Sequence, residues 1–413
     1  MDKERQNILW NMAGSFCYAF ASMVLSFLVM RMVGKEEGGV FAFGYSTFGQ
    51  QMFIVAYFGI RPFQVTDGAG EYRFGDYFLH RCLTCMAAVA AGAVYLLFYG
   101  YGPWKAGVIF LLVCYKVIDG FADVYESEFQ RTGNLHLTGK SNTFRTLLSV
   151  GVFLIALWTG GSLLWACGAA VAAQVAGVLI FDLPVSRRLP SIDWGMDVRR
   201  LIPLTRATVL LFISVFLDFY IFSAAKYAID AYMDDVASGY FNVIFMPTSV
   251  INLAAGFVIR PVLTYLTGYW EQKRYERFVS MLGKISWLIM ALSMLALVLA
   301  WILGKPVLTI LERILGAVYT GSLTAYHSAF VVVILGGGFY AILNLYYYVL
   351  VILRRQTVIF GIYGVLTVLA WILAPMFVKQ GGILGAAWVY LILMIFMAAG
   401  FIVGAWVFYF REK

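Results

Sequence analysis

The sequence predicts an all-α protein that crosses a membrane about twelve times, and two observations carry this prediction. Of the 413 residues, 62% are hydrophobic and 13% are charged, whereas soluble domains have roughly half apolar and a quarter charged residues. The apolar residues also gather in windows of roughly 20, the length at which a helix spans the hydrocarbon with every backbone N–H and C=O paired inside it. Such windows recur along the whole chain.

The windows follow one another with mostly short connections. Residues 1–7 carry acids as well as bases, the first apolar stretch is too long for the apolar region of a signal peptide, and no small-residue cleavage site follows it. We therefore expect the first span to be retained. The predicted spans are 8–33, 39–60, 82–100, 103–127, 144–160, 162–182, 203–228, 240–266, 282–303, 326–353, 357–378 and 383–410.

Lys and Arg predict the orientation of the spans, because positive residues are kept on the cytoplasmic side. With the N-terminus inside, most of the 30 Lys and Arg residues fall in cytoplasmic connections. Both chain ends are then cytoplasmic. The net charge of +8 reflects this bias, with some attraction to anionic lipid headgroups, and does not indicate nucleic acid.

Weak internal similarity predicts two pseudo-symmetric halves of six helices each, an arrangement common in transporters. Residues 58–62 read Phe-Gly-Ile-Arg-Pro at the predicted end of span two, and residues 257–261 read Phe-Val-Ile-Arg-Pro in span eight. Gly160-Gly161 before span six also recurs as Gly381-Gly382 before span twelve. The predicted domains are 1–182 and 203–413, joined by a polar linker at 183–202, and residues 304–325 form an outer insertion.

Span four carries four charged residues on one helical face. Lys116, Asp119, Asp123 and Glu126 are spaced by three, four and three residues. An ionisable side chain inside a span costs roughly 2.5–3.5 kcal/mol, so this face is expected to meet protein or water. Two interpretations stay open: an internal Lys–Asp pair that holds helices together, or a proton or cation site in which Asp119 changes charge.

Other polar residues also fall inside spans. Asp218 lies in the middle of span seven with no basic residue within one turn. It is expected either to couple transport to an ion or to pair with Lys116 or an arginine. The remaining polar candidates either line a polar pathway or make interhelical hydrogen bonds, the second being favoured for each alone; they are Asn11, Gln50, Gln51, Asn252 and Asn344.

Arginines near span ends form a third group of candidates. For Arg31, Arg61 and Arg260, reaching to lipid headgroups is the default interpretation. Arg61 and Arg260 differ because the repeat relates them, which predicts that they face each other. A pair of guanidinium groups suits a diphosphate, since each binds phosphate oxygens through two N–H groups and stays charged.

The five cysteines predict no redox or metal chemistry. Three of them lie inside apolar spans, where a free thiol behaves as a small hydrophobic group. Cys82 and Cys85 form a C-x-x-C near His80, but the only other histidines are His136 and His327. We therefore assign them a structural role, and no metal or cofactor is expected.

Several short motifs spread along the chain carry a resemblance to a known family. They are 64–67, 119–130 with 139–141, 245–247, 260–263, and 338–340 through 354–355. Together they resemble the bacterial polysaccharide flippases of the Wzx type, in the multidrug/oligosaccharidyl-lipid/polysaccharide exporter superfamily. The resemblance covers the whole chain and is diffuse.

The resemblance implies two six-helix bundles around a central cavity in the bacterial cytoplasmic membrane. It also implies transfer of an undecaprenyl-diphosphate-linked oligosaccharide to the outer leaflet for surface polysaccharide synthesis, such as O-antigen or lipopolysaccharide. Cationic cavity residues of related flippases hold the diphosphate, and Arg31, Arg61 and Arg260 match them by span and depth. The expected partners are this substrate, membrane lipids, a glycan polymerase and glycosyltransferases, with coupling to H⁺, Na⁺ or the membrane potential.

Two other functions fit the sequence less well. A multidrug exporter of the same superfamily, coupled to Na⁺ or H⁺, would be expected to have a carboxylate-rich cavity, whereas the repeat-related residues here are arginines. A glycan ligase or acyltransferase is disfavoured, because the outer loops are short and His327 stands alone. The protein is therefore expected to be a transporter and not an enzyme.

Overall fold

The computed structural model describes residues 3–67 and 70–412, with the backbone alone at 260, 261, 264 and 412. The described residues are helical and contain no strand, which confirms the all-α prediction. The chain packs as two compact units, unit 1 (Met1–Phe216) and unit 2 (Leu217–Lys413). This division falls inside a helix that follows the predicted linker, and the predicted domain bounds stay a prediction.

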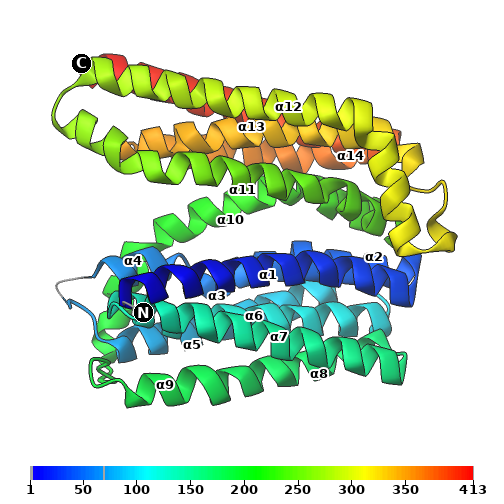
Figure 1. Ribbon diagram of the computed structural model, residues 1–413, viewed down its shortest axis with the longest axis horizontal. Helices are drawn as coiled ribbons and strands as arrows, with labels where there is room; N and C mark the ends of the chain where they lie inside the picture. Colours follow the sequence, from blue (N-terminus) through cyan, green and yellow to red (C-terminus); the bar gives the residue numbers. More distant parts are fainter. Residues whose placement is uncertain (1–2, 68–69, 413) are drawn as a thin grey trace. The chain divides into compact units, whose positions relative to one another are not determined.

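Unit 1 contains mostly long helices that lie side by side (Figure 1). The α7 helix packs against both α1 and α8, and α6 packs against α3, α5 and α8. Its elements are α1 (Lys3–Val33), α2 (Lys35–Phe43), η1 (Gly44–Phe48), α3 (Gly49–Tyr57), α4 (Ile60–Thr66), α5 (Phe74–Tyr99), α6 (Pro103–Arg131), α7 (Leu135–Gly160), α8 (Leu163–Gly177), η2 (Val178–Asp182), α9 (Leu183–Arg188), η3 (Val198–Arg200) and the first half of α10 (Leu201–Tyr232).

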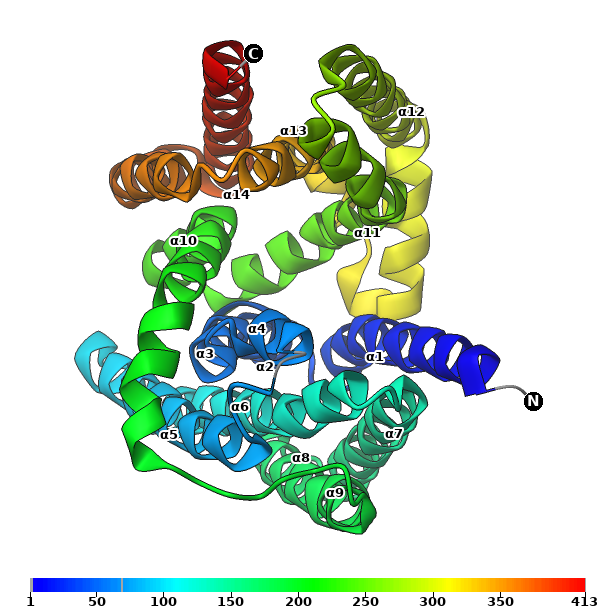
Figure 2. The same ribbon diagram turned by 90° about the vertical axis from the view of Figure 1, so that its left-hand side faces the viewer.

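Unit 2 begins in the second half of α10. In it, α13 packs against α11, α12 and α14 (Figure 2). Its further elements are α11 (Asp235–Glu271), α12 (Tyr275–Leu315), η4 (Ala317–Tyr319), η5 (Thr324–Tyr326), α13 (His327–Ile352) and α14 (Gln356–Glu412).

Among the described residues, nine helical segments are long and apolar enough to cross a membrane. The twelve predicted spans exceed these nine segments by three, and each difference has a structural reason. Span two is divided among α2, η1 and α3, and span four is α6, whose charges lower its hydropathy. Spans eleven and twelve are joined in α14, where Gly382 has non-helical backbone angles. The chain is therefore a multi-pass helical membrane protein.

Span two does not run as one helix, because two residues adopt left-handed backbone angles. Phe58 (φ 51°) ends α3 and Gly59 (φ 67°) precedes α4. The ring of Phe58 stacks on that of Phe212 of α10, with centroids 4.3 Å apart. The short α4 then leads away in a new direction and carries Arg61. Glycine at 59 favours this break, since it adopts positive φ at no steric cost.

The related segment in unit 2 behaves differently. Residues 257–261 lie within the continuous helix α11, which extends to Glu271. Val258 stands where the first segment has Gly59, and a β-branched residue disfavours positive φ. The two segments therefore differ in their backbone, because only the first one interrupts its helix.

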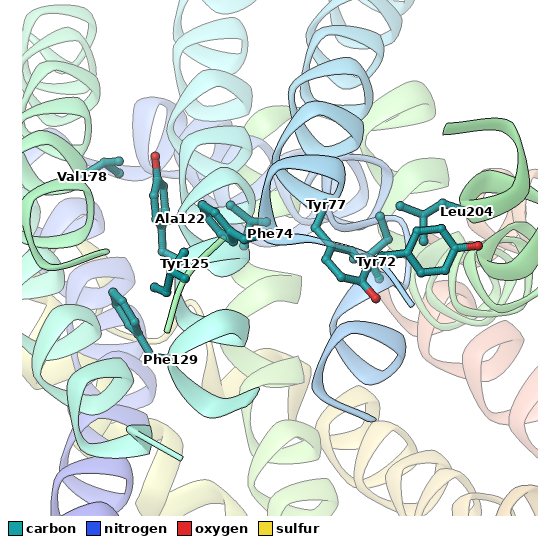
Figure 3. Packing of buried hydrophobic residues seen from close by; sticks show 11 residues of the cluster. Tyr72, Phe74, Tyr77, Ala122, Tyr125, Phe129, Val178 and Leu204 are labelled. Atoms are coloured by element: carbon teal, nitrogen blue, oxygen red, sulfur yellow. The ribbon is translucent and has the colours of Figure 1, made fainter. Parts of the chain in front are cut away.

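The linker is held on unit 1 by an aromatic cluster. Figure 3 shows Phe74 close to Ala122 and Tyr125 of α6, and Tyr72 close to Tyr77. Trp194 of the linker packs on this cluster, with its ring centroid 4.7 Å from that of Phe74. The predicted polar linker thus packs along one end of unit 1.

Candidate functional site

The charged face of α6 lies buried inside unit 1, as its spacing predicted, and its main partners are arginines from other helices. Arg61 of α4 donates to Asp123 Oδ1 at 2.5 Å and lies 3.6 Å from Glu126 Oε2. It also donates to Gln130 Oε1 at 3.2 Å. Arg81 of α5 donates to the other oxygen of Asp123 at 3.1 Å. Asp123 therefore joins α4, α5 and α6.

Arg145 of α7 forms the second centre of this charge network. It donates to Asp119 Oδ1 at 3.1 Å, to Glu126 Oε1 at 2.7 Å and to Asp182 Oδ2 at 3.2 Å. Asp182 also accepts from Ser141. Because Arg145 is 2% exposed, these contacts replace water for the whole guanidinium group. They tie α6, α7 and η2 together.

We call Arg61, Arg81, Arg145, Asp119, Asp123, Glu126 and Asp182 the unit-1 network. Removing one partner of a buried ion pair costs about 3–5 kcal/mol, because the other charge is left uncompensated. The network has four carboxyl groups and three arginines. Its charges therefore balance only if one carboxyl group holds a proton or if Lys116 supplies a fourth positive charge.

Lys116 is one turn from Asp119 but does not pair with it directly. Its Nζ donates to the hydroxyl of Tyr18 at 3.2 Å, and this hydroxyl donates to Asp119 Oδ2 at 2.9 Å. The ammonium group also lies 3.9 Å from the ring centroid of Tyr45. The predicted Lys–Asp pair is thus bridged by a tyrosine from α1.

Both π-helical segments of the described chain lie beside these charges. The segment η1 contains Tyr45, which meets Lys116, and η2 ends at Asp182, which meets Arg145. A π-helical turn inserts an extra residue and redirects the side chains that follow, and such turns are frequent at functional sites. The distortions of spans two and six therefore place residues of the charged cluster.

A neighbouring cluster lies toward the end of α6. Glu128 accepts from Gln64 at 2.9 Å and from Arg131 at 2.7 Å. In the adjoining loop, Asp67 accepts from the backbone N–H groups of Glu71 and Tyr72 at 2.9 and 3.0 Å. Burial alone would raise the pKa of Asp67, but these donors outweigh it and lower the pKa below its ordinary value.

Asp218 of α10 has a different environment in unit 2. Its Oδ2 accepts from the hydroxyl of Tyr340 of α13 at 2.9 Å, whereas Oδ1 is buried with no hydrogen-bond partner among the described residues. Tyr347 and Tyr363 also lie close enough to interact electrostatically with this carboxylate. Asp218 is thus held by tyrosines and not by an arginine in the described part of the chain.

Lys226 lies two turns further along α10 and was not among the predicted site residues. Its Nζ donates to Asn242 Oδ1 of α11 at 3.3 Å and lies 4.3 Å from the ring centroid of Phe245. In the sequence its only signal was a single charge near the end of an apolar span.

Of the arginines predicted to bind diphosphate, Arg31 and Arg61 lie far apart within unit 1. Arg31 is exposed in the last turn of α1. Asn7, near the start of the same helix, accepts a hydrogen bond from His136 at the start of α7. This contact is close to the end of α6, where Arg61 donates to Gln130. Arg31 lies 24 residues further along α1, which is about 36 Å at 1.5 Å per residue. The side chain of Arg260 lies outside the described residues.

The other polar candidates are spread over both units. Asn11 lies where α1 approaches Gly139 of α7 closely. Gln51 donates to the backbone oxygen of Phe216 at 3.1 Å. Gln50, Asn252 and Asn344 are half-buried, and Asn252 Oδ1 has no hydrogen-bond partner among the described residues.

No family model and no curated protein matches the chain, but solved structures do. An inward-facing multidrug resistance MATE family transporter of the MOP superfamily matches at 12% identity and a TM-score of 0.59, covering 99% of this chain and 93% of that chain. The Vibrio cholerae MATE transporter VcmN in its bent form matches at 13% identity and a TM-score of 0.57, covering 99% of this chain and 96% of that chain.

A third match is a MOP superfamily transporter from Pyrococcus furiosus, described as having a binding pocket of reverse polarity that suggests a different function. It matches at 13% identity and a TM-score of 0.51, covering 100% of this chain and 94% of that chain. Identities this low show the fold alone. The chain thus has the two-lobed helical fold of MATE transporters of the MOP superfamily, as the predicted fold class required.

Proposed function

We propose that this protein is a lipid-linked oligosaccharide flippase of the bacterial cytoplasmic membrane. It moves an undecaprenyl-diphosphate-linked glycan to the outer leaflet by alternating access, for surface polysaccharide synthesis. The observation that supports this proposal best is Arg61. Its side chain is 27% exposed, whereas those of Arg81 and Arg145 in the same network are 0% and 2% exposed.

Arg61 is suited to bind an anion in the course of a transport cycle. Its guanidinium group is oriented by Asp123 and Gln130 and keeps part of its surface accessible. A diphosphate can offer two oxygens to the planar group, and arginine stays charged at any physiological pH. Asp123 and Glu126 would compete with the phosphate, so binding and release would change the contacts of α4 with α6. Arg260, related to Arg61 by the repeat, is the proposed second contact.

Coupling to an ion is proposed at Asp218. Asp119 accepts from Arg145 and Tyr18, so a change in its charge would disturb a network that holds several helices. Asp218 Oδ1 is buried without a hydrogen-bond partner among the described residues and can accept a proton or a monovalent cation. The membrane potential acting on the arginines is the alternative driving force.

The second candidate function is a multidrug exporter coupled to Na⁺ or H⁺. Two observations favour it: the fold is that of multidrug MATE transporters, and Asp218 lies among tyrosines. A carboxylate beside aromatic rings suits an organic cation. A drug-accumulation assay in an efflux-deficient host decides between the two, because export of organic cations would favour the exporter.

Complementation of a flippase-null strain at native expression tests the diphosphate role. Losing hydrogen bonds between Arg61 and a charged phosphate costs about 1.5–3 kcal/mol, so Arg61→Ala is expected to lower transport roughly tenfold or more. Arg260→Ala is expected to act in the same direction. Arg188→Ala, at an exposed arginine of α9, is the matched control.

Membrane abundance and thermal stability of each variant separate loss of function from loss of folding. If Arg61→Ala and Arg260→Ala both complement fully, the diphosphate role is wrong. The proposed partners, a glycan polymerase and glycosyltransferases, are expected to be encoded by neighbouring genes.

A further inference from the structure

Unit 2 contains an apolar groove of about 430 Å³ along the middle parts of three helices. It lies along α12, α13 and α14, at the centre of predicted spans nine, ten and twelve. Figure 2 shows α12 and the C-terminal part of α14 as separate ribbons, each beside α13. Twelve residues line the groove, among them Met290, Ser293, Met294, Gly338, Ala398 and Ala399, and all but Ser293 are apolar.

Small residues shape the groove. Ala398 and Ala399 of α14 leave space where larger side chains would fill it, and Gly338 of α13 lets α12 come close. A Cβ atom on Gly338 would come within 2.9 Å of the Cβ of Ser293, so α12 and α13 approach closely at one edge of the groove. Met290 and Met294, which are 55% and 60% exposed, form its outer rim. The groove therefore opens away from the core of unit 2.

The depth of the groove limits what can occupy it. No water is available at the centre of the bilayer, so the occupant is either a hydrocarbon chain or another protein surface. A stable protein interface takes roughly 20–30 residues on each side, whereas twelve residues line this groove. The groove alone is smaller than one side of a stable interface, and its size suits a single hydrocarbon chain.

The shape of the groove favours a branched chain. Its lining residues cover one stretch of eight residues on each helix, from 290 to 297, 335 to 342 and 395 to 402, which is roughly 10 Å along the axis. A volume of about 430 Å³ over that length is wider than an extended polymethylene chain needs. Methyl branches would fill the extra width, and the two flexible methionines can adapt to them.

We propose that this groove binds the isoprenoid tail of the lipid-linked substrate, an inference that rests on the proposed function. The tail stays in the hydrocarbon while the diphosphate and glycan are moved, and the groove keeps the tail against unit 2. Because lipid chains are as apolar as the groove, binding gains packing contacts and little hydrophobic free energy. The expected preference is therefore modest.

Photocrosslinking in vesicles tests the occupant. A benzophenone side chain replaces Met294 in the groove or, as the control, Val368, which is 57% exposed on the first part of α14. The probes are labelled undecaprenyl phosphate and labelled phosphatidylglycerol, offered separately. We expect about fivefold more capture of the undecaprenyl chain at 294 than at 368, about 1 kcal/mol of preference, with equal capture of the phospholipid. Equal capture of the two probes at position 294 would overturn the proposal. Crosslinking of the benzophenone at 294 to a second copy of the chain would overturn it as well.

Transport by groove-filling variants gives the second readout. Ala399→Leu fills the groove, and Ala90→Leu adds the same side chain at an exposed position of α5. We expect Ala399→Leu to lower transport of the undecaprenyl-linked substrate about fivefold relative to Ala90→Leu. If the unmodified protein does not move this substrate, the proposed function fails. If it does and Ala399→Leu behaves like Ala90→Leu, the groove inference fails.

Discussion

The two units hold their buried charged groups in different ways. In unit 1, Asp119, Asp123 and Glu126 each contact an arginine from another helix. In unit 2, Asp218 is held by a tyrosine hydroxyl, and Lys226 by an amide oxygen and an aromatic ring. A change in one charge of unit 1 would disturb several helices at once, whereas Asp218 can change its charge with local adjustment. The difference indicates that unit 1 uses its charges mainly to fix helix packing, with Arg61 at its accessible edge.

The largest expected effect is the loss of Arg145. Arg145→Gln removes the shared partner of Asp119, Glu126 and Asp182, so we expect the free energy of unfolding to fall by about 3–5 kcal/mol. Thermal unfolding in detergent, with Arg188→Gln as the control, measures it. A melting temperature equal to that of the control would show that the network does not hold unit 1 together.

Asp218→Asn, in contrast to Arg145→Gln, is expected to change stability little and transport strongly. The amide oxygen can still accept from Tyr340, so stability should change by less than about 1 kcal/mol. Transport should fall roughly 100-fold and lose its dependence on the proton or Na⁺ gradient. Transport rates in vesicles under imposed gradients give the measurement. Normal gradient dependence in this variant would remove Asp218 from the coupling mechanism.

A second carboxylate sharpens the comparison within unit 2. Glu312 accepts from the backbone N–H groups of Gly321, Leu323 and Thr324 at 2.7 to 2.9 Å, and so anchors the loop after α12. Glu312→Gln keeps the shape, but its amide nitrogen cannot accept a hydrogen bond as the second carboxylate oxygen does, and its remaining oxygen is neutral. The expected loss is about 1.5–3 kcal/mol. Limited proteolysis should then cut the segment 316–326 faster, while cleavage at 189–197 is unchanged. Equal cleavage of 316–326 in the variant and the unmodified protein would contradict this role.

The smallest expected effect concerns Asp67 and acid. Because its folded-state pKa is lowered, its contribution is present above the ordinary aspartate pKa and is lost as the pH falls through the folded value. Asp67→Asn should therefore lower the melting temperature at pH 7 and matter progressively less toward pH 3. A destabilisation that is constant over this range would show that the charge of Asp67 is unimportant.

The sequence predicted the features that depend on local pattern. Apolar windows located the spans, and the spacing of Lys116, Asp119, Asp123 and Glu126 correctly indicated a buried face of α6. The isolation of Asp218 from basic residues was also visible, and the structure pairs it with a tyrosine.

The partners of that face could not be predicted. Arg81 and Arg145 lie near span ends, where the positive-inside rule already explains a charge, and Asp182 lies at the end of an apolar window. Their contacts depend on how α5, α7 and η2 pack on α6, which leaves no periodic signal. The break at Phe58–Gly59 was missed for a similar reason, since the motif at 257–261 looks alike but stays helical.

The central proposal, that the protein moves lipid-linked glycan, is tested most directly by reconstitution. Purified protein is placed in vesicles with a labelled undecaprenyl-diphosphate oligosaccharide, and a membrane-impermeant glycosidase reports the glycan in the outer leaflet. We expect the protected glycan to become accessible with the unmodified protein and far more slowly with Arg61→Ala, and organic cations in the same vesicles to stay in place. Efflux of organic cations without any movement of the glycan would contradict the account and identify a multidrug exporter.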